Sequence, residues 1–253
     1  MHLAPIITEP SFYAVAIPAV IFLGLAKGGF SGVGMAATPL LAMYLPPLEA
    51  AALLLPILIC QDVISVRAYW RDWSAWNLKV LLPGAALGMA LGWLFAAQVP
   101  DNAIRVLIGG VAVGFVADAW LRRSRAPRKQ GTALGGLFWG AVSGFTSFAS
   151  QGGGPPFQMF TLPQRLPKMT FVGTTTLFFA AVNLMKILPY LMLAQFSARN
   201  LSTSLALLPI AVAANFTGIW MIRVVTTAQF YRATYALLLV LGTALIWQGA
   251  SHL

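Results

Sequence analysis

Charged residues are scarce in this sequence, and acidic residues are the scarcest of them. Of the 253 residues 9% are charged, and six are Asp or Glu, whereas soluble domains carry about 25% charged residues. So few charges cannot cover a water-soluble fold, and the mean hydropathy of +0.80 indicates that lipid surrounds most of the chain. Together with the long apolar runs described below, this predicts an all-α membrane protein.

Histidine and cysteine are almost absent. His2 and His252 lie at the extreme ends, and Cys60 stands alone in an apolar run, where we expect it to be buried. A chain without histidine in its body lacks the residue that a Ser-His-Asp hydrolase or a histidine-ligated metal site needs. The sequence therefore predicts no enzyme activity, no cofactor, no metal site and no internal disulfide.

The net charge of +10 comes from basic residues in short gaps between apolar runs. The positive-inside rule explains this placement, because Lys and Arg gather in cytoplasmic loops, so we expect a lipid bilayer and no nucleic acid as partner. The densest cluster is RRSRAPRKQ at 122–130, which we predict to be a cytoplasmic linker.

A transmembrane helix needs about 20 mostly apolar residues. Six runs meet this requirement, at 48–66, 76–96, 102–121, 169–195, 200–222 and 228–250. Two further regions, 12–45 and 131–163, are interrupted by KGGFSGVG (27–34) and SQGGGPP (150–156). Because Gly and Pro break helix hydrogen bonding, neither region fits one simple span, and each is predicted to form a re-entrant or short-helix hairpin or an interrupted span.

The two interrupted regions look like copies of one element. They align without a gap, with Gly24 and Gly28 on Gly140 and Gly144, Ser31 on Ser147, and Pro39 on Pro155; later, Pro83 and Gly92 align on Pro209 and Gly218. The sequence thus predicts two homologous halves, an N-terminal repeat at 1–121 and a C-terminal repeat at 131–253, each with three transmembrane helices after its interrupted region.

The basic residues indicate how the two halves are oriented. If each interruption belongs to one full span, the repeats are parallel and the bases fall on both sides. If each interruption is a hairpin that returns, the repeats are inverted, and most bases lie on the side of the linker, namely Arg67, Arg71, Lys79, Arg165, Lys168, Arg223 and Arg232. The positive-inside rule favours inverted repeats with both termini outside, which is periplasmic in a bacterium.

The interruptions are the first candidates for a binding site. A broken helix exposes backbone N–H groups and a positive helix end, which bind anions. The candidate substrate-binding residues here are Lys27, Gly28, Gly29, Ser31, Ser147, Gln151, Gly152, Gly153 and Gly154. The alternatives are that the glycines permit close helix packing and that Lys27 extends to a membrane interface.

Ionisable residues within apolar runs are the second candidates, because they are costly in a bilayer and usually functional. Asp62 is the coupling candidate, although it could instead pair with Arg67. Lys186, with Asn183 one turn earlier, is a candidate substrate contact or proton-responsive group; an ion pair or an interfacial anchor is the alternative. The hydroxyl run TTT at 174–176 is better explained by helix packing.

Four motifs resemble those of a known family. They are AKGGFSGVGMAATPLL (26–41), LLPGAALGMALG (81–92), GFTSFASQGGGPP (144–156) and NLMKILPY (183–190). In these motifs, and in their order and spacing, the chain resembles the sulfite exporter TauE/SafE family, also described as TSUP permeases. The resemblance implies a secondary transporter, often an exporter, of small sulfur-containing anions such as sulfite or organosulfonates, in the inner membrane when the protein is bacterial.

The favoured hypothesis is therefore an alternating-access transporter that binds a small anion between its halves near the interruptions, with or without coupled protons. A passive anion channel, a transporter of another small organic anion, a membrane enzyme and a structural membrane subunit are the alternatives. A channel needs a continuous polar pore, whereas the polar residues here are scattered. The sequence predicts no particular oligomeric state.

Overall fold

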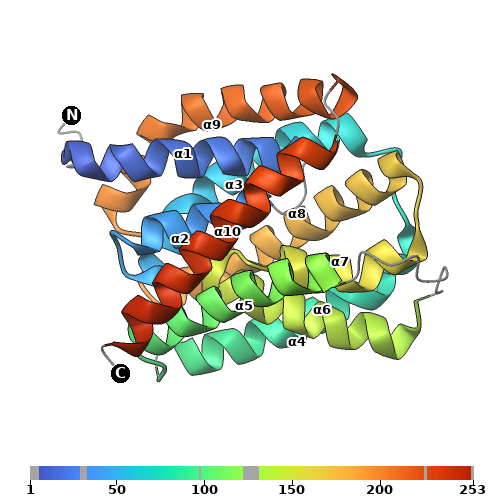
Figure 1. Cartoon of the computed structure of the whole chain (residues 1–253), viewed down its shortest axis with the longest axis horizontal. Coiled ribbons are helices and arrows are strands. Elements are labelled where there is room, and N and C mark those ends of the chain that lie inside the picture. The colour runs from blue at the N-terminus through green and yellow to red at the C-terminus, as the bar shows by residue number, and fades with distance from the viewer. Residues whose placement is uncertain (1–5, 29–32, 97, 122–130, 225–226, 252–253) are drawn as a thin grey trace.

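The computed structural model describes residues 6–28, 33–96, 98–121, 131–224 and 227–251. Throughout these residues it contains helices and no strand (Figure 1). The elements are α1 Pro10–Lys27, η1 Val33–Ala36, α2 Ala37–Ala42, α3 Pro47–Tyr69, α4 Ala75–Ala96, α5 Asp101–Leu121, α6 Ala133–Ser150, α7 Gly154–Thr161, η2 Leu162–Gln164, α8 Lys168–Met192, α9 Ala198–Val224 and α10 Thr227–Ala250. The predicted all-α class is confirmed, and the six predicted runs coincide, to within one turn, with α3, α4, α5, α8, α9 and α10.

Among the described residues, five helices are long and apolar enough to cross a membrane, namely α1, α3, α4, α8 and α9, while α5, α6 and α10 contain shorter apolar stretches. The helix α1 extends beyond its apolar stretch at both ends: Pro10 lies in its first turn and Lys27 in its last turn. Its 18 residues span about 27 Å at 1.5 Å per residue, close to the hydrocarbon thickness of about 30 Å.

Cys60 is exposed on α3, so the expectation that it is buried is wrong. Val63, on the same helix, is 68% exposed. In a membrane protein an apolar side chain is as stable against lipid as against protein, so an apolar run does not reveal which of its faces points inward.

The first interrupted region forms a hairpin that returns to the side on which it starts. After the turn, Gly34 lies beside Ala26 near the end of α1. Past α2, the Tyr44 hydroxyl reaches the start of α1, where it donates to the Glu9 carboxylate and lies 3.1 Å from Ser11 Oγ. The chain therefore leaves the hairpin on the side where α1 began.

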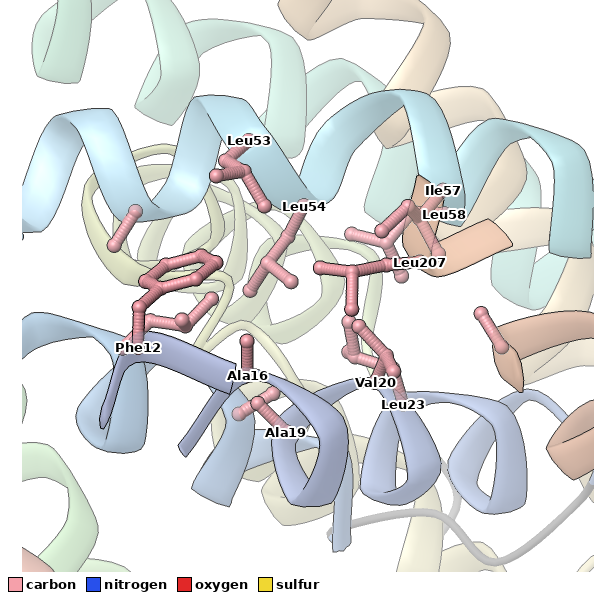
Figure 2. Close-up of a cluster of buried hydrophobic side chains, with 14 of the residues drawn as sticks. Phe12, Ala16, Ala19, Val20, Leu23, Leu53, Leu54, Ile57, Leu58 and Leu207 are labelled. Atoms are coloured by element: carbon pink, nitrogen blue, oxygen red, sulfur yellow. The ribbon is translucent and has the colours of Figure 1, made fainter. Parts of the chain in front are cut away.

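The next helix, α3, runs parallel to α1. In Figure 2 the α1 side chains from Phe12 to Leu23 face the α3 side chains from Leu53 to Leu58 in the same order. These residues belong to one buried cluster, so the long arm of the hairpin is fixed against α3 along its length.

The second interrupted region has the same form. Phe160, near the end of α7, lies beside the start of α6, where a Cβ atom on Gly131 would lie 2.6 Å from its ring. The following helix, α8, runs parallel to α6, because the Tyr190 hydroxyl late in α8 donates to the Phe148 carbonyl near the end of α6 (2.6 Å). Each half thus contains a helical hairpin followed by a long helix parallel to its first arm.

The two halves run in opposite directions. The Asn183 amide of α8 donates to Asp62 of α3 (2.7 Å), and the backbone N–H of Ser74, just past the end of α3, donates to Thr174 near the start of α8 (2.9 Å). The helices α3 and α8 are therefore antiparallel. Since α1 is parallel to α3 and α6 is parallel to α8, α1 and α6 also point in opposite directions.

Each half packs its first helix on the other half. The helix α1 lies beside α9 (Figure 1), and α6 lies beside α4. A Cβ atom on Gly24 would lie 2.7 Å from the Asn215 backbone nitrogen of α9, and one on Gly88 of α4 would overlap the Ala141 carbonyl oxygen of α6. Small residues spaced four apart allow such close contact between membrane helices.

The packing corrects the register of the sequence repeat. Gly24 contacts Ala211 of α9, whereas Gly144, and not Gly140, makes the equivalent contact with Ala85 of α4. Ala85 and Ala211 are equivalent because each lies two residues after the aligned prolines of the two halves. Glycines recur at every fourth position in both hairpins, so an alignment one helical turn out of register still matches glycine with glycine.

Candidate functional site

The two hairpins meet at a cavity of about 90 Å³, which has room for a small ion or a few water molecules and not for a drug-sized ligand. One part of its wall is apolar, with Leu23, Leu58 and Phe179. The remainder carries an ammonium group, amides and hydroxyls, from Lys27, Ser147, Gln151, Gln158, Thr175, Thr176 and Asn183. The cavity combines a positive charge with neutral hydrogen-bonding groups, which suits a small anion.

Lys27, the last residue of α1, forms an ion pair with Asp62 of α3. The side chains are only 11% and 7% exposed, so Lys27 does not extend to a membrane interface. The second Asp62 oxygen accepts the bond from Asn183 described above. Arg67, the partner considered for Asp62 from the sequence, is exposed, and the carboxylate pairs across the helix interface instead.

Lys186 is completely buried in α8, so it is not an interfacial anchor. Its ammonium group donates to Gln151 Oε1 and to Asn183 Oδ1, the latter at 3.1 Å. Among the side chains that the structure describes, no carboxylate lies within ion-pair distance of it. The connected groups Lys27, Asp62, Asn183, Lys186 and Gln151 thus hold two lysines and one carboxylate.

Gln151 joins the end of α6 to both halves. Its side chain accepts from Lys186 and donates to the Ala51 carbonyl of α3 (3.0 Å). Its backbone is left-handed, with φ 55°, in a C-terminal turn where Gly152 N–H donates to the Thr146 carbonyl (3.2 Å). A non-glycine residue in this conformation costs about 1–2 kcal/mol. Observed strain of this kind supports a functional hypothesis for the side chain.

Replacing Gln151 by Gly separates this strain from the side-chain contacts. We expect the thermal stability to stay within about 1 kcal/mol of wild type, because relief of the left-handed strain offsets the lost amide bonds. Anion transport should fall at least about tenfold, because Lys186 loses the partner that orients it. The matched control is Ala194→Gly, which relaxes another left-handed residue (φ 52°) outside the cavity and should leave transport unchanged. Equal transport by both variants would assign Gln151 no role in the site.

The glycines predicted for the site differ in what they contact. Gly28 packs against Gly218 of α9, where an added Cβ atom would overlap the backbone. Gly153 is held between α6 and α8, since its Cβ atom would lie 2.7 Å from the Ser143 carbonyl oxygen. Gly152 forms the turn after α6, and Gly154 lines the cavity. Gly29 and Ser31 lie outside the described residues.

The start of α7 offers fewer donors than expected. It begins with Gly154, and the next two residues, Pro155 and Pro156, have no backbone N–H. The amides at this helix end that could donate to an anion are therefore those of Gly153 and Gly154.

Four polar or aromatic wall residues were not among the predicted site residues, namely Gln158, Thr175, Thr176 and Phe179. Thr174 does pack as expected, since it bonds Ser74 and the Thr170 carbonyl. The sequence carried a usable signal for α8, because residues 176, 179, 183 and 186 recur at spacings of three and four and share one helix face. It carried none for Gln158, whose position follows from the return of α7.

The comparisons with known proteins agree with the geometry. The family model described as Sulfite exporter TauE/SafE matches residues 16–245, which confirms the resemblance seen in the four motifs. No curated protein and no solved structure matches the chain. Because the family match covers most of the chain, the protein belongs to the sulfite exporter TauE/SafE family and is a multi-pass membrane transporter rather than an enzyme.

Proposed function

We propose that this protein is a secondary transporter that exports small sulfur-containing anions such as sulfite or organosulfonates. The observation that carries the proposal is the connected group of two lysines and one carboxylate where the two hairpins meet. The excess positive charge attracts an anion, and the small cavity volume favours a small one. Family membership supports the sulfur oxyanion as substrate.

Substrate would bind beside Lys27, with neutral donors around it, and Lys186 would act from behind Gln151 and Asn183, because it does not itself line the cavity. Ser147, Gln151 and Asn183 would supply hydroxyl and amide groups. The start of α7 would add the backbone N–H groups of residues 153–154. The apolar wall would face the part of an organosulfonate that carries no charge. In this mechanism, Asp62 is the residue to which we assign the coupling of transport to its driving force.

Alternating access would follow from two inverted repeats, residues 1–121 and 131–253. The opposite directions of α1 and α6, and the exchange of first helices between the halves, support this architecture. Rocking of one half against the other would expose a site at their interface to each side in turn. A site built from both hairpins would be opened and closed by this motion.

The same architecture predicts a topology. Arg67, Arg71, Lys79, Arg165 and Lys168 lie near helix ends on one side, where α3 ends and where α4, α6 and α8 begin. By the positive-inside rule this side is cytoplasmic, so both termini are expected outside, in the periplasm of a bacterium. Reporter fusions that fluoresce in the cytoplasm and ones active only outside it, placed at each terminus and in the linker, would measure this. A cytoplasmic N-terminus would contradict the proposed orientation.

The function is tested with purified protein in liposomes loaded with labelled sulfite or methanesulfonate. We expect saturable efflux that needs the protein and is inhibited by the unlabelled anion. Protein-free liposomes give the background. If neither anion moves under any pH or ion gradient, the proposed substrate class is wrong, and if flux does not saturate, the protein conducts as a channel instead.

A further inference from the structure

In each half, a side chain at the end of the first helix contacts the long helix of the same half, but the charges of the two contacts differ. In the first half, Lys27 at the end of α1 pairs with Asp62 of α3. In the second half, Gln151 at the end of α6 pairs with Lys186 of α8. Both contacts belong to one connected group of side chains, in which Asp62 is the carboxylate and Lys186 the second cation.

The carboxylate of Asp62 holds the place where an anion would bind to Lys27. It contacts the ammonium group directly, and its other oxygen is held by Asn183, whose carbonyl oxygen accepts from Lys186. Asn183 therefore lies between the carboxylate and the second lysine. An anion that enters the cavity and binds the Lys27 ammonium group competes with Asp62 for it.

Asp62 has room to give way. Besides its contact with Lys27, it lines a separate groove between α3 and α8. Arg67 lines the same groove and offers the displaced carboxylate a second cation. Release of Lys27 would therefore not require the surrounding helices to repack.

We propose that Asp62 is a built-in counter-anion that substitutes for the substrate when the site is empty, which allows the empty protein to reorient and so to export anions without taking another back. This inference rests on the proposed transport function. It adds that transport occurs as net export rather than as obligatory exchange of one anion for another.

The charges of the site explain this mode. With Asp62 the empty site has one excess positive charge, and a monovalent anion that takes the place of Asp62 on Lys27 leaves the same excess. Without Asp62 the empty site has two, and the loaded site has one, the same as the empty wild-type site. Since closing the site removes water from these groups, each uncompensated charge raises the cost of closure. An Asp62→Asn protein should therefore reorient when loaded and fail to reorient when empty.

The experiment compares two modes of sulfite efflux from proteoliposomes at mildly acidic pH, where the singly charged form predominates, with the membrane potential held at zero. Net efflux is measured into sulfite-free buffer, and exchange is measured into buffer with unlabelled sulfite. We expect wild type to perform both, and Asp62→Asn to lose net efflux at least about tenfold while it retains exchange.

Two variants separate this role from a structural one. Lys27→Gln breaks the same ion pair but removes a positive charge from the empty site, so its affinity should fall while its ratio of net efflux to exchange stays at the wild-type value. Asp72→Asn removes an exposed carboxylate and should change neither mode. Asp62→Ser removes the same charge if Asp62→Asn does not fold.

Equal loss of both modes in Asp62→Asn, or the same exchange-only behaviour in Lys27→Gln, would overturn the inference. So would a wild-type protein that only exchanges. If wild type moves sulfite in neither mode, the proposed function itself fails, a result distinct from a defect confined to the Asp62 variants.

Discussion

Replacing Lys186 by Gln is expected to lower sulfite transport about 10- to 100-fold, because a charge-assisted hydrogen bond to a buried anion is worth about 1.5–3 kcal/mol and each 1.36 kcal/mol is a factor of ten in rate. Lys186 is fully buried, and its ammonium group is held by Gln151 and Asn183 rather than by a carboxylate. Lys186 does not itself line the cavity, but both of its partners do, so its positive charge lies one side chain away from a substrate there. Initial rates of efflux from proteoliposomes, normalised to folded protein, measure the loss.

Stability should change in the opposite direction. Removal of a buried charge that lacks an ion-pair partner relieves a desolvation cost, so the Lys186→Gln protein is expected to unfold at the same or a higher temperature than wild type. The matched control is Lys79→Gln on α4, where the side chain is exposed and both transport and stability should be unchanged. A lower unfolding temperature together with lost transport would assign Lys186 to the structure rather than to the site.

Replacing Gly88 by Ala is expected to destabilise the protein by about 3 kcal/mol, the upper range for overpacking of a close interface. An added Cβ atom would overlap the Ala141 carbonyl oxygen, and a backbone atom of α6 cannot rotate away as a flexible side chain could. The helices α4 and α6 would have to separate, which opens the contact between the two halves. Thermal unfolding in detergent, followed by size-exclusion chromatography, measures the effect.

Gly110→Ala is the control for this change. Gly110 also lies in a helix, α5, but an added Cβ atom there meets nothing within 4 Å. Since Ala favours a helix over Gly, this variant should gain about 0.5–1 kcal/mol. Similar unfolding temperatures for the two variants would contradict this prediction. They would show that the cost of bringing a Cβ atom against α6 at Gly88 has been overestimated.

The general architecture follows from local properties of the sequence. The scarcity of charge and the long apolar runs require lipid around the chain, and a helix is the form in which each such run satisfies its own backbone hydrogen bonds. The interruptions at 27–34 and 150–156 are visible because Gly and Pro act on their immediate neighbours. Lys27, Gln151, Asn183 and Lys186 were found because polar residues in apolar runs are conspicuous.

The arrangement of the site depends on contacts that no local pattern contains. Asp62 is five residues from Arg67, yet it bonds Lys27 and, 121 residues away, Asn183. Gly28 serves helix packing because α9, from the other half, crosses it.

The sequence by itself determined that the chain is a membrane protein, where it is interrupted and which polar residues are unusual. Only the tertiary structure decided which of these residues meet, in which register the halves correspond and which glycines serve packing. The physical reason is that an isolated helix fixes only contacts three and four residues apart. The positions of the two lysines and of Asp62 are set by two halves that run in opposite directions and pack against each other.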